Sequence, residues 1–321
     1  MTAAAPARLP AAVAIAGAVA VGMLTALQAR INGQLGLHLG DGFVAAVVSF
    51  GSGLVALVAL SAAVPSGRRG ARALASGIRH RTIPWWMLAG GAAGALTVAT
   101  QGLAVAVIGV SLFTVGVVAG QTLSGLLLDR VGYGPAGVVA VTIPRVVGGA
   151  LALVAVAISL QGGVLERVPW WMLVLPFLAG IGIAWQQATN GRLRQRVGTP
   201  LTATLVNFIG GTAILAVAAL AHVAVVGAPA VWPTDPWLYL GGVIGVTYIF
   251  LSAALVVHTG VLLLGLGAVA GQLVTAFLLD AAWPADAGPG WLAELAMVIV
   301  AGTGVVVAAT PSSWRRRRRR D

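Results

Sequence analysis

Two glutamines stand inside apolar stretches that occur twice in the chain. Residues 118–129 read VAGQTLSGLLLD and residues 269–280 read VAGQLVTAFLLD, with seven of the twelve positions identical. The amide is Gln121 in the first stretch and Gln272 in the second, and each stretch ends on an aspartate. A polar side chain in hydrocarbon is costly unless it faces other protein groups or a cavity. Such an amide can hydrogen-bond a substrate or a neighbouring helix, and the pattern leaves both roles open.

The spacing to the two aspartates places both glutamines at a similar depth. Each glutamine precedes its aspartate, Asp129 or Asp280, by eight residues, which is about 12 Å along a helix. Half of the hydrocarbon core of a bilayer is about 15 Å thick, so an aspartate at the boundary puts the glutamine near the midplane. We therefore expect Gln121 and Gln272 to line one central cavity. The aspartates are expected at helix ends, in or near interfacial water, where they serve topology or loop pairing.

A second pair of polar motifs surrounds two Asn-Gly dipeptides, in QARINGQL at 28–35 and QQATNGRL at 186–193. Asn-Gly is a strong turn signal, so Asn32 and Asn190 are predicted to stop or break a helix. Broken helices in transporters expose backbone groups to substrate, although a purely structural role for the asparagines stays open. The candidate substrate-binding residues are therefore Gln28, Asn32, Gln121, Trp185, Gln186, Asn190, Asn207 and Gln272.

The sequence lacks the residues that several other kinds of protein chemistry require. The chain contains neither cysteine nor lysine, which excludes a thiolate metal site, a cysteine nucleophile and a P-loop lysine. None of the four histidines has partners at metal-ligand spacing. We expect no cofactor, no metal and no enzymatic activity. The net charge of +11 comes from arginines in short clusters between apolar spans, which does not favour nucleic acid as a partner.

The composition indicates an integral membrane protein. Of 321 residues, 59% are hydrophobic and only 8% are charged, whereas a soluble domain carries about 25% charged residues. A membrane-spanning helix needs about 20 apolar residues. Ten segments qualify or nearly so, and they cover 11–31, 43–64, 84–106, 109–128, 143–160, 169–189, 201–223, 236–257, 260–280 and 291–310. The short breaks around Gly109 and Gly260 predict tight hairpins, and the Gly- and Pro-rich residues 131–143 predict an interfacial or re-entrant connection.

Arginine placement predicts the orientation of the spans. With ten spans both termini share one side, and that side holds the 65–83 loop, the end of the sixth span and the arginine tail at 315–320. The opposite side holds only Arg30 and Arg167. We therefore expect both termini in the cytoplasm and the lipid bilayer as the main surroundings of the chain.

The repeated motifs belong to a longer internal repeat. QARINGQL and QQATNGRL lie 158 residues apart, whereas the VAGQ stretches lie 151 residues apart, as do GGAAG at 90–94 and GGVIG at 241–245. A contraction in one loop of the second copy reconciles the two offsets. The chain thus divides into a five-helix repeat at 1–161 and a second one at 162–321. Because five is odd, the second repeat enters the membrane inverted, which is a common transporter architecture.

The repeated QARINGQLG, PWW–GG–G and VAGQ…LLD stretches resemble the drug/metabolite transporter superfamily, and most closely its YdcZ-like, EamA-related branch in a fused ten-helix form. The resemblance implies a secondary transporter, of exporter type, for a small metabolite or drug-like molecule in the bacterial inner membrane. The alternatives are a membrane scaffold or sensor partner and an intramembrane enzyme. Related small multidrug members carry a glutamate in their first span, which this chain lacks, so transport is not expected to depend on one mid-membrane carboxylate. Proton or ion coupling, and the choice between monomer and homodimer, stay open.

Overall fold

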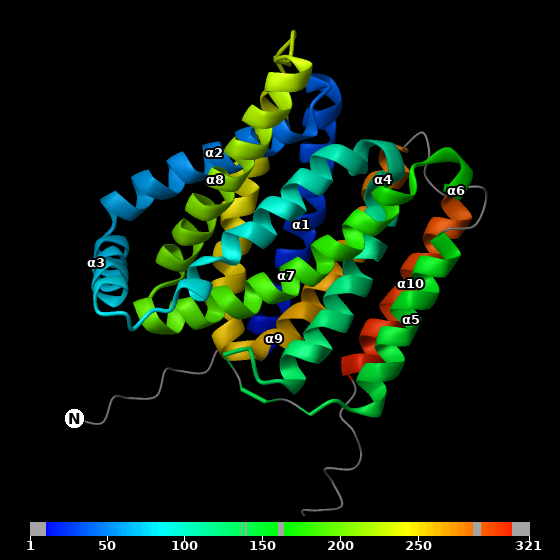
Figure 1. Cartoon of the computed structure of the whole chain (residues 1–321). Helices are drawn as coiled ribbons and strands as arrows, with labels where there is room; N and C mark the ends of the chain where they lie inside the picture. The colour runs from blue at the N-terminus through cyan, green and yellow to red at the C-terminus, as the bar shows by residue number, and fades with distance from the viewer. Residues whose placement is uncertain (1–10, 136, 139, 160–163, 285–289, 310–321) are drawn as a thin grey trace, which may run out of the picture.

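The computed structural model describes residues 11–135, 137–138, 140–159, 164–284 and 290–309, and it is all-helical over these ranges (Figure 1). Within them, the side chains of 11, 152, 159, 164–165, 257–263, 266 and 308–309 are not described. The first repeat contributes α1 (Ala11–Leu39), α2 (Gly42–Ala63), α3 (Pro65–Arg79), the 3-10 turn η1 (Trp85–Leu88), α4 (Gly90–Arg130) and α5 (Ile143–Ser159). The short α6 (Val164–Arg167) leads to α7 (Trp170–Val197), α8 (Pro200–Val226), η2 (Pro236–Tyr239), α9 (Gly241–Ala282) and α10 (Trp291–Ala309).

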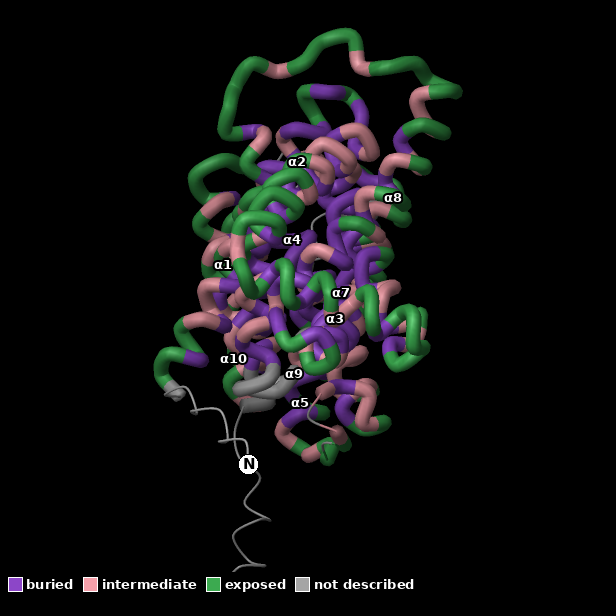
Figure 2. Tube along the Cα trace, turned by 90° about the vertical axis from the view of Figure 1, so that its left-hand side faces the viewer, coloured by how far each residue is buried: buried purple, intermediate pink, exposed green. Residues whose placement is uncertain are grey.

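The predicted spans coincide with these helices. Six described helical segments are long and apolar enough to cross a bilayer, and Ile143–Ile158, Gly267–Ala282 and Trp291–Val307 are shorter apolar helices. Buried residues gather in the middle of the bundle and exposed residues lie on its outside (Figure 2). The outward residues include large apolar ones such as Val55 and Leu220, exposed by 72% and 71%. An apolar exterior of this kind is suited to lipid rather than water.

Helix α4 reverses direction at Gly109, as the sequence predicted. Gly109 has φ +83° and ψ 162°, a backbone conformation that glycine adopts without strain. The first arm of α4 runs antiparallel to α7, because Gly90 faces Asn190 and Ala93 faces Gly182. The second arm runs parallel to α7, since Gly116 faces Pro176 and Gly120 faces Ile181. Both arms therefore pack on one helix of the other repeat.

Helix α9 repeats this arrangement against α1. Gly245 faces Gln28 and Leu255 faces Gly17, so the first arm of α9 is antiparallel to α1. Gly267 faces Ala18 and Gly271 faces Met23, so the second arm is parallel to it. The direction thus changes between Leu255 and Gly267. The predicted turn residue Gly260 lies among the residues whose side chains are not described.

These contacts come in pairs that differ by the two offsets of the sequence repeat. The contact of Gly116 with Pro176 in one half corresponds to that of Gly267 with Ala18 in the other. Phe50 and Phe208, which are 158 residues apart, stack directly on each other with ring centroids 4.6 Å apart. A pseudo-two-fold axis therefore passes between the two rings. Because α1 packs on α9 and α7 on α4, the two repeats interlock rather than sit side by side.

The Asn-Gly dipeptides do not stop their helices, so that prediction was wrong. Helix α1 continues through Asn32 to Leu39, and α7 continues through Asn190 to Val197. Asn32 Nδ2 donates to Gln101 Oε1 at 2.7 Å, which is a tertiary bond that outweighs the local turn preference. The following glycines serve close packing, since a Cβ at Gly33 would lie 2.8 Å from that of Val105.

The arginine-rich segment predicted as a loop forms helix α3. Pro65 occupies its first turn, a favourable place for proline, and its buried face is glycine, which lets α3 lie against the start of α8 at Thr199 and Thr202. Helix α3 shares one side of the bundle with the start of α1 and the end of α7, which we call the terminal side. The other side, with the end of α1 and the turn at Gly109, is called the far side.

Candidate functional site

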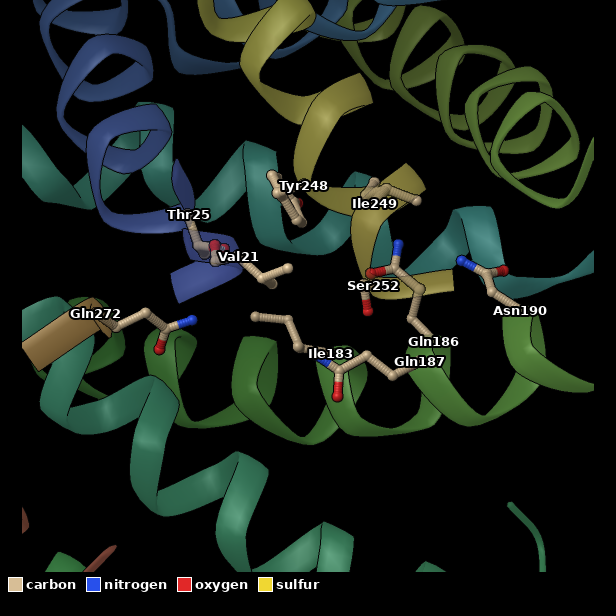
Figure 3. Close-up of a pocket in the computed structure, with 10 residues that line it drawn as sticks. All are labelled: Val21, Thr25, Ile183, Gln186, Gln187, Asn190, Tyr248, Ile249, Ser252 and Gln272. Carbon is tan, nitrogen blue, oxygen red and sulfur yellow. Dashed lines mark hydrogen bonds between the residues drawn. The ribbon is translucent and has the colours of Figure 1, made fainter. Parts of the chain in front are cut away.

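A small cavity lies between α1, α7 and both arms of α9 (Figure 3). Its volume is about 10 Å³, which is room for about one water molecule. It lies toward the terminal side, because Asn190 and Ser252 belong to the later turns of α7 and of the first α9 arm, and we call it the terminal-side cavity. Its lining residues are Val21, Thr25, Ile183, Gln186, Gln187, Asn190, Tyr248, Ile249, Ser252 and Gln272.

A second cavity of the same volume, about 10 Å³, lies between α1, α4 and α7 on the way to the far side. We call it the far-side cavity. Its lining residues are Thr25, Ala26, Ala29, Thr97, Gln101, Phe113, Thr114, Val117, Ile183 and Gln272. Thr25, Ile183 and Gln272 line both cavities, so these three side chains separate the two spaces.

The internal repeat relates the two cavities to each other. Thr25 and Ile183 are 158 residues apart, so the two separating side chains from α1 and α7 occupy equivalent positions. Gln101 of the far-side cavity corresponds to Ser252 of the terminal-side cavity at the offset of 151. Neither cavity would hold a metabolite as it stands. The described part of the bundle thus holds two small polar spaces that the pseudo-symmetry relates.

The two glutamines of the VAGQ stretches occupy different surroundings. Gln272 is buried, lines both cavities, and its Oε1 has no hydrogen-bond partner among the described residues. Gln121 is also buried, but it lies outside both linings, and its Nε2 is 3.5 Å from Oε1 of the lining residue Gln187. A joint cavity lined by both VAGQ glutamines stays a prediction.

The remaining amide candidates form two buried clusters where α9 and α4 begin. Gln28 Nε2 donates to Gly241 O at 2.8 Å, beside the bond of Asn32 to Gln101. In the other repeat, Gln186 Nε2 donates to Asn207 Oδ1 at 3.2 Å. A Cβ at Gly90 would lie 2.6 Å from Asn190 Oδ1, so the glycine makes room for the amide.

The predicted substrate-binding residues fall into two groups, those that line a cavity and those that do not. Gln186 and Asn190 also line the terminal-side cavity, whereas Gln28, Asn32 and Asn207 lie beyond the linings. Trp185 is half-buried and lies outside both. Sequence reasoning did not single out Thr25, Gln101 or Ser252. A hydroxyl or amide at repeat-equivalent positions of apolar spans could have found Gln101 and Ser252, whereas the equivalent of Thr25 is Ile183, so the repeat gives no such signal for it.

The two repeated aspartates lie near helix ends, as expected, but both are buried against other protein groups rather than exposed to interfacial water, which corrects that part of the expectation. Asp280 accepts hydrogen bonds from the backbone N–H groups of Val110, at 3.0 Å, and Ser111. These groups open the second arm of α4, where unpaired N–H groups and the helix dipole favour a carboxylate. Asp129 instead pairs with Arg145, with Oδ2 and a guanidinium nitrogen 3.4 Å apart.

An all-helical bundle with membrane-length spans, inverted repeats and paired polar cavities at its centre is the architecture of a membrane transport protein. The chain belongs to the YdcZ family of the drug/metabolite transporters, because the family model described as "Putative inner membrane exporter, YdcZ" matches residues 13–158 and again residues 167–309. The protein is therefore a multi-pass inner-membrane protein of an exporter family, not an enzyme.

Structural comparison supports the same fold. A solved crystal structure aligns with a TM-score of 0.52 over 96% of this chain and 98% of its own, at 18% sequence identity. At that identity the likeness speaks for the fold alone. No curated protein matches this sequence.

Proposed function

We propose that this protein is a secondary transporter that exports a small metabolite or drug-like molecule by alternating access. The observation that carries the proposal is the pair of repeat-related cavities that share Thr25, Ile183 and Gln272 as lining residues. Inverted repeats favour two conformations in which the two repeats exchange their arrangements around one central site. A rocking motion that widens one cavity while closing the other would move a substrate past these three side chains.

The interlocked arms supply the moving parts for this mechanism. Each of α1 and α7 is held between the two arms of a helix from the other repeat, so a rotation of either helix shifts both cavities. Gly120 lies against the carbonyl of Phe177, and Gly271 lies against that of Val19. Such glycine contacts permit close sliding of helix backbones in a membrane.

The cargo site of the proposal comprises Gln272, Gln186 and Asn190 in the terminal-side cavity, with Gln121 acting through Gln187. The arginine asymmetry supports a cytoplasmic terminal side, which would make the terminal-side cavity the loading side for export.

Reconstituted vesicles test the proposal. Flux across a panel of metabolites and drugs, with and without a pH gradient, would be measured for the wild type, Gln272→Leu, Gln121→Leu and the double variant. We expect Gln272→Leu to lower flux at least tenfold and the two changes to be non-additive, because the amides act on one ligand. Gln34→Leu, on α1 but outside both linings, is the matched control. Wild-type flux in all variants would contradict the proposed site.

A further inference from the structure

The chemistry of the two cavity linings points to the kind of molecule that they accept. The polar lining groups are amides and hydroxyls, namely Thr25, Thr97, Gln101, Thr114, Gln186, Gln187, Asn190, Tyr248, Ser252 and Gln272. None of the described lining residues is an aspartate, glutamate, arginine or histidine. A tyrosine phenol carries no charge at neutral pH. The path is therefore polar without a fixed charge along its described walls.

The buried charges nearby are engaged elsewhere. Asp280 is held by two backbone N–H groups, and Asp129 pairs with Arg145. Arg194 donates to the carbonyls of Ala253 and Ala254, at 2.9 and 2.6 Å. None of these side chains lines either cavity, and neither does Glu294 on α10. No charged side chain in the described part of the chain thus lines either cavity, where it could compensate an ion.

Several buried amides retain an unused hydrogen-bonding atom. Oε1 of Gln272 and Oε1 of Gln121 are acceptors without a partner in the described part of the chain, and Nε2 of Gln101 is such a donor. Gln272 and Gln101 line the cavities, and Gln121 is bonded to a lining residue. Leaving such groups unpaired is unfavourable, and a ligand with both donors and acceptors would supply their missing partners.

We infer that the substrate is a small molecule without net charge, bearing both hydroxyl or amide donors and acceptors, such as a polyol or a carboxamide. This inference rests on the proposed transport function and names the substrate class of the same site. A buried ion without a counter-charge loses its hydration and gains little in return, so the linings discriminate against it. A neutral polar molecule exchanges its water contacts for those of Gln272 and Gln101.

Matched sets of probes test the charge preference. One set is xylitol, xylonate and 1-amino-1-deoxyxylitol, and a second is nicotinamide, nicotinate and 3-(aminomethyl)pyridine, each at a pH where the acid and the amine are ionised. Proteoliposomes and protein-free liposomes would be loaded with equimolar mixtures, and release would be followed by mass spectrometry. Thermal stabilisation of the purified protein by each probe would be measured in parallel.

We expect the neutral member of at least one set to leave at least tenfold faster than its charged members and to stabilise the protein. Gln272→Leu should reduce both effects at least tenfold, and Gln34→Leu should leave them unchanged. Preferred release of a charged member that depends on Gln272 would overturn the substrate class while leaving transport intact. Stabilisation by a neutral member without any protein-dependent release would instead contradict transport and support the class. No stabilisation and no release by any probe would overturn the class.

Discussion

Gly36 on the far side and Arg194 on the terminal side occupy the same place in the two repeats, 158 residues apart. At the far side, a Cβ on Gly36 would overlap the carbonyl oxygen of Gly102, so α1 and the first arm of α4 meet backbone to backbone. At the terminal side, the counterpart of Gly102 is Ala253, and Arg194 reaches its carbonyl with a long side chain. One crossing is closed by packing and the other by hydrogen bonds.

Neighbouring contacts extend this difference. On the terminal side, Arg192 donates to Gly132 O at 2.7 Å, and its guanidinium carbon lies 5.7 and 5.3 Å from the ring centroids of Trp86 and Tyr133. Tyr133 also bonds Thr189 at 3.0 Å, which ties the 131–142 connection to α7 beside the terminal-side cavity. Side-chain bonds can be exchanged for water, whereas a glycine crossing can only separate by moving whole helices. We therefore expect the terminal side to open at a lower free-energy cost.

The largest expected effect is in thiol labelling, which tests which face of the membrane the terminal side and the far side each occupy. Because the chain has no cysteine, Ser66→Cys on α3 and Thr234→Cys before η2 each introduce a single exposed thiol, one on each side of the bundle. In intact cells, an impermeant thiol reagent should label Thr234→Cys and leave Ser66→Cys unlabelled. Permeabilised cells, in which both should react, are the control. Labelling of Ser66→Cys but not of Thr234→Cys in intact cells would instead place the terminal side outside the cell and the far side in the cytoplasm.

Enlarging the far-side crossing should be the most damaging change to stability. Gly36→Ala places a methyl group against a backbone that cannot rotate away, and overpacking costs about 1–3 kcal/mol. We expect a loss of about 3 kcal/mol in the free energy of unfolding, measured by denaturation in mixed micelles. Gly51→Ala is the matched control, because nothing lies within 4 Å of its added Cβ. Alanine there should stabilise α2 by up to about 1 kcal/mol, and equal losses in both variants would refute the packed crossing.

Removing the terminal-side bonds should change access more than folding. In a Ser252→Cys background, Arg194→Ala should raise labelling of the buried thiol from the terminal side about tenfold, which corresponds to about 1.4 kcal/mol. Arg196→Ala removes the same charge from an exposed position of α7 and is the control. If labelling is unchanged by Arg194→Ala, the guanidinium is a passive surface group and the contrast with Gly36 has no bearing on opening.

The features that the sequence predicted are those encoded in local patterns or in exact repetition. Apolar runs marked the spans, Gly109 marked the reversal of α4, and the offsets of 158 and 151 recur in the contacts of Gly116 and Gly267. The placement of Gln272, Gln186 and Asn190 at a cavity could be anticipated, since amides in apolar spans must face the interior.

Features that depend on distant partners could not be predicted. Asn32 lies within a continuous helix, and its side chain bonds Gln101, 69 residues away. Asp280 is buried because it accepts hydrogen bonds from the N–H groups of Val110 and Ser111, about 170 residues earlier. Helix α3 packs through Gly70 against Thr199 and Thr202 at the start of α8, a contact with residues about 130 positions later. Trp185 and Asn207 looked alike as cavity candidates, yet only the fold shows that Asn207 bonds Gln186 and that Trp185 lies outside the linings.

The smallest expected effect on stability concerns Asp280 on the far side, whose binding partner differs in kind from that of Asp129 on the terminal side. Asp280 binds the backbone at the start of the second α4 arm, whereas Asp129 binds the side chain of Arg145. An asparagine at 280 keeps an amide oxygen for one N–H group but loses the charge that favours the helix N-terminus. We expect Asp280→Asn to lower the free energy of unfolding by about 1 kcal/mol, within the range for a partly buried helix-dipole interaction.

Flux separates this structural role from a role in coupling. If Asp280 only holds the arm, Asp280→Asn should retain at least half of the wild-type flux and the same dependence on a pH gradient, while Asp280→Ala is less stable because both N–H groups lose their acceptor. Asp235→Asn, at an exposed residue whose side chain makes no capping bond, is the control. Loss of proton-driven flux in a folded Asp280→Asn protein would make this carboxylate a coupling group, and the far side would then carry chemistry as well as packing.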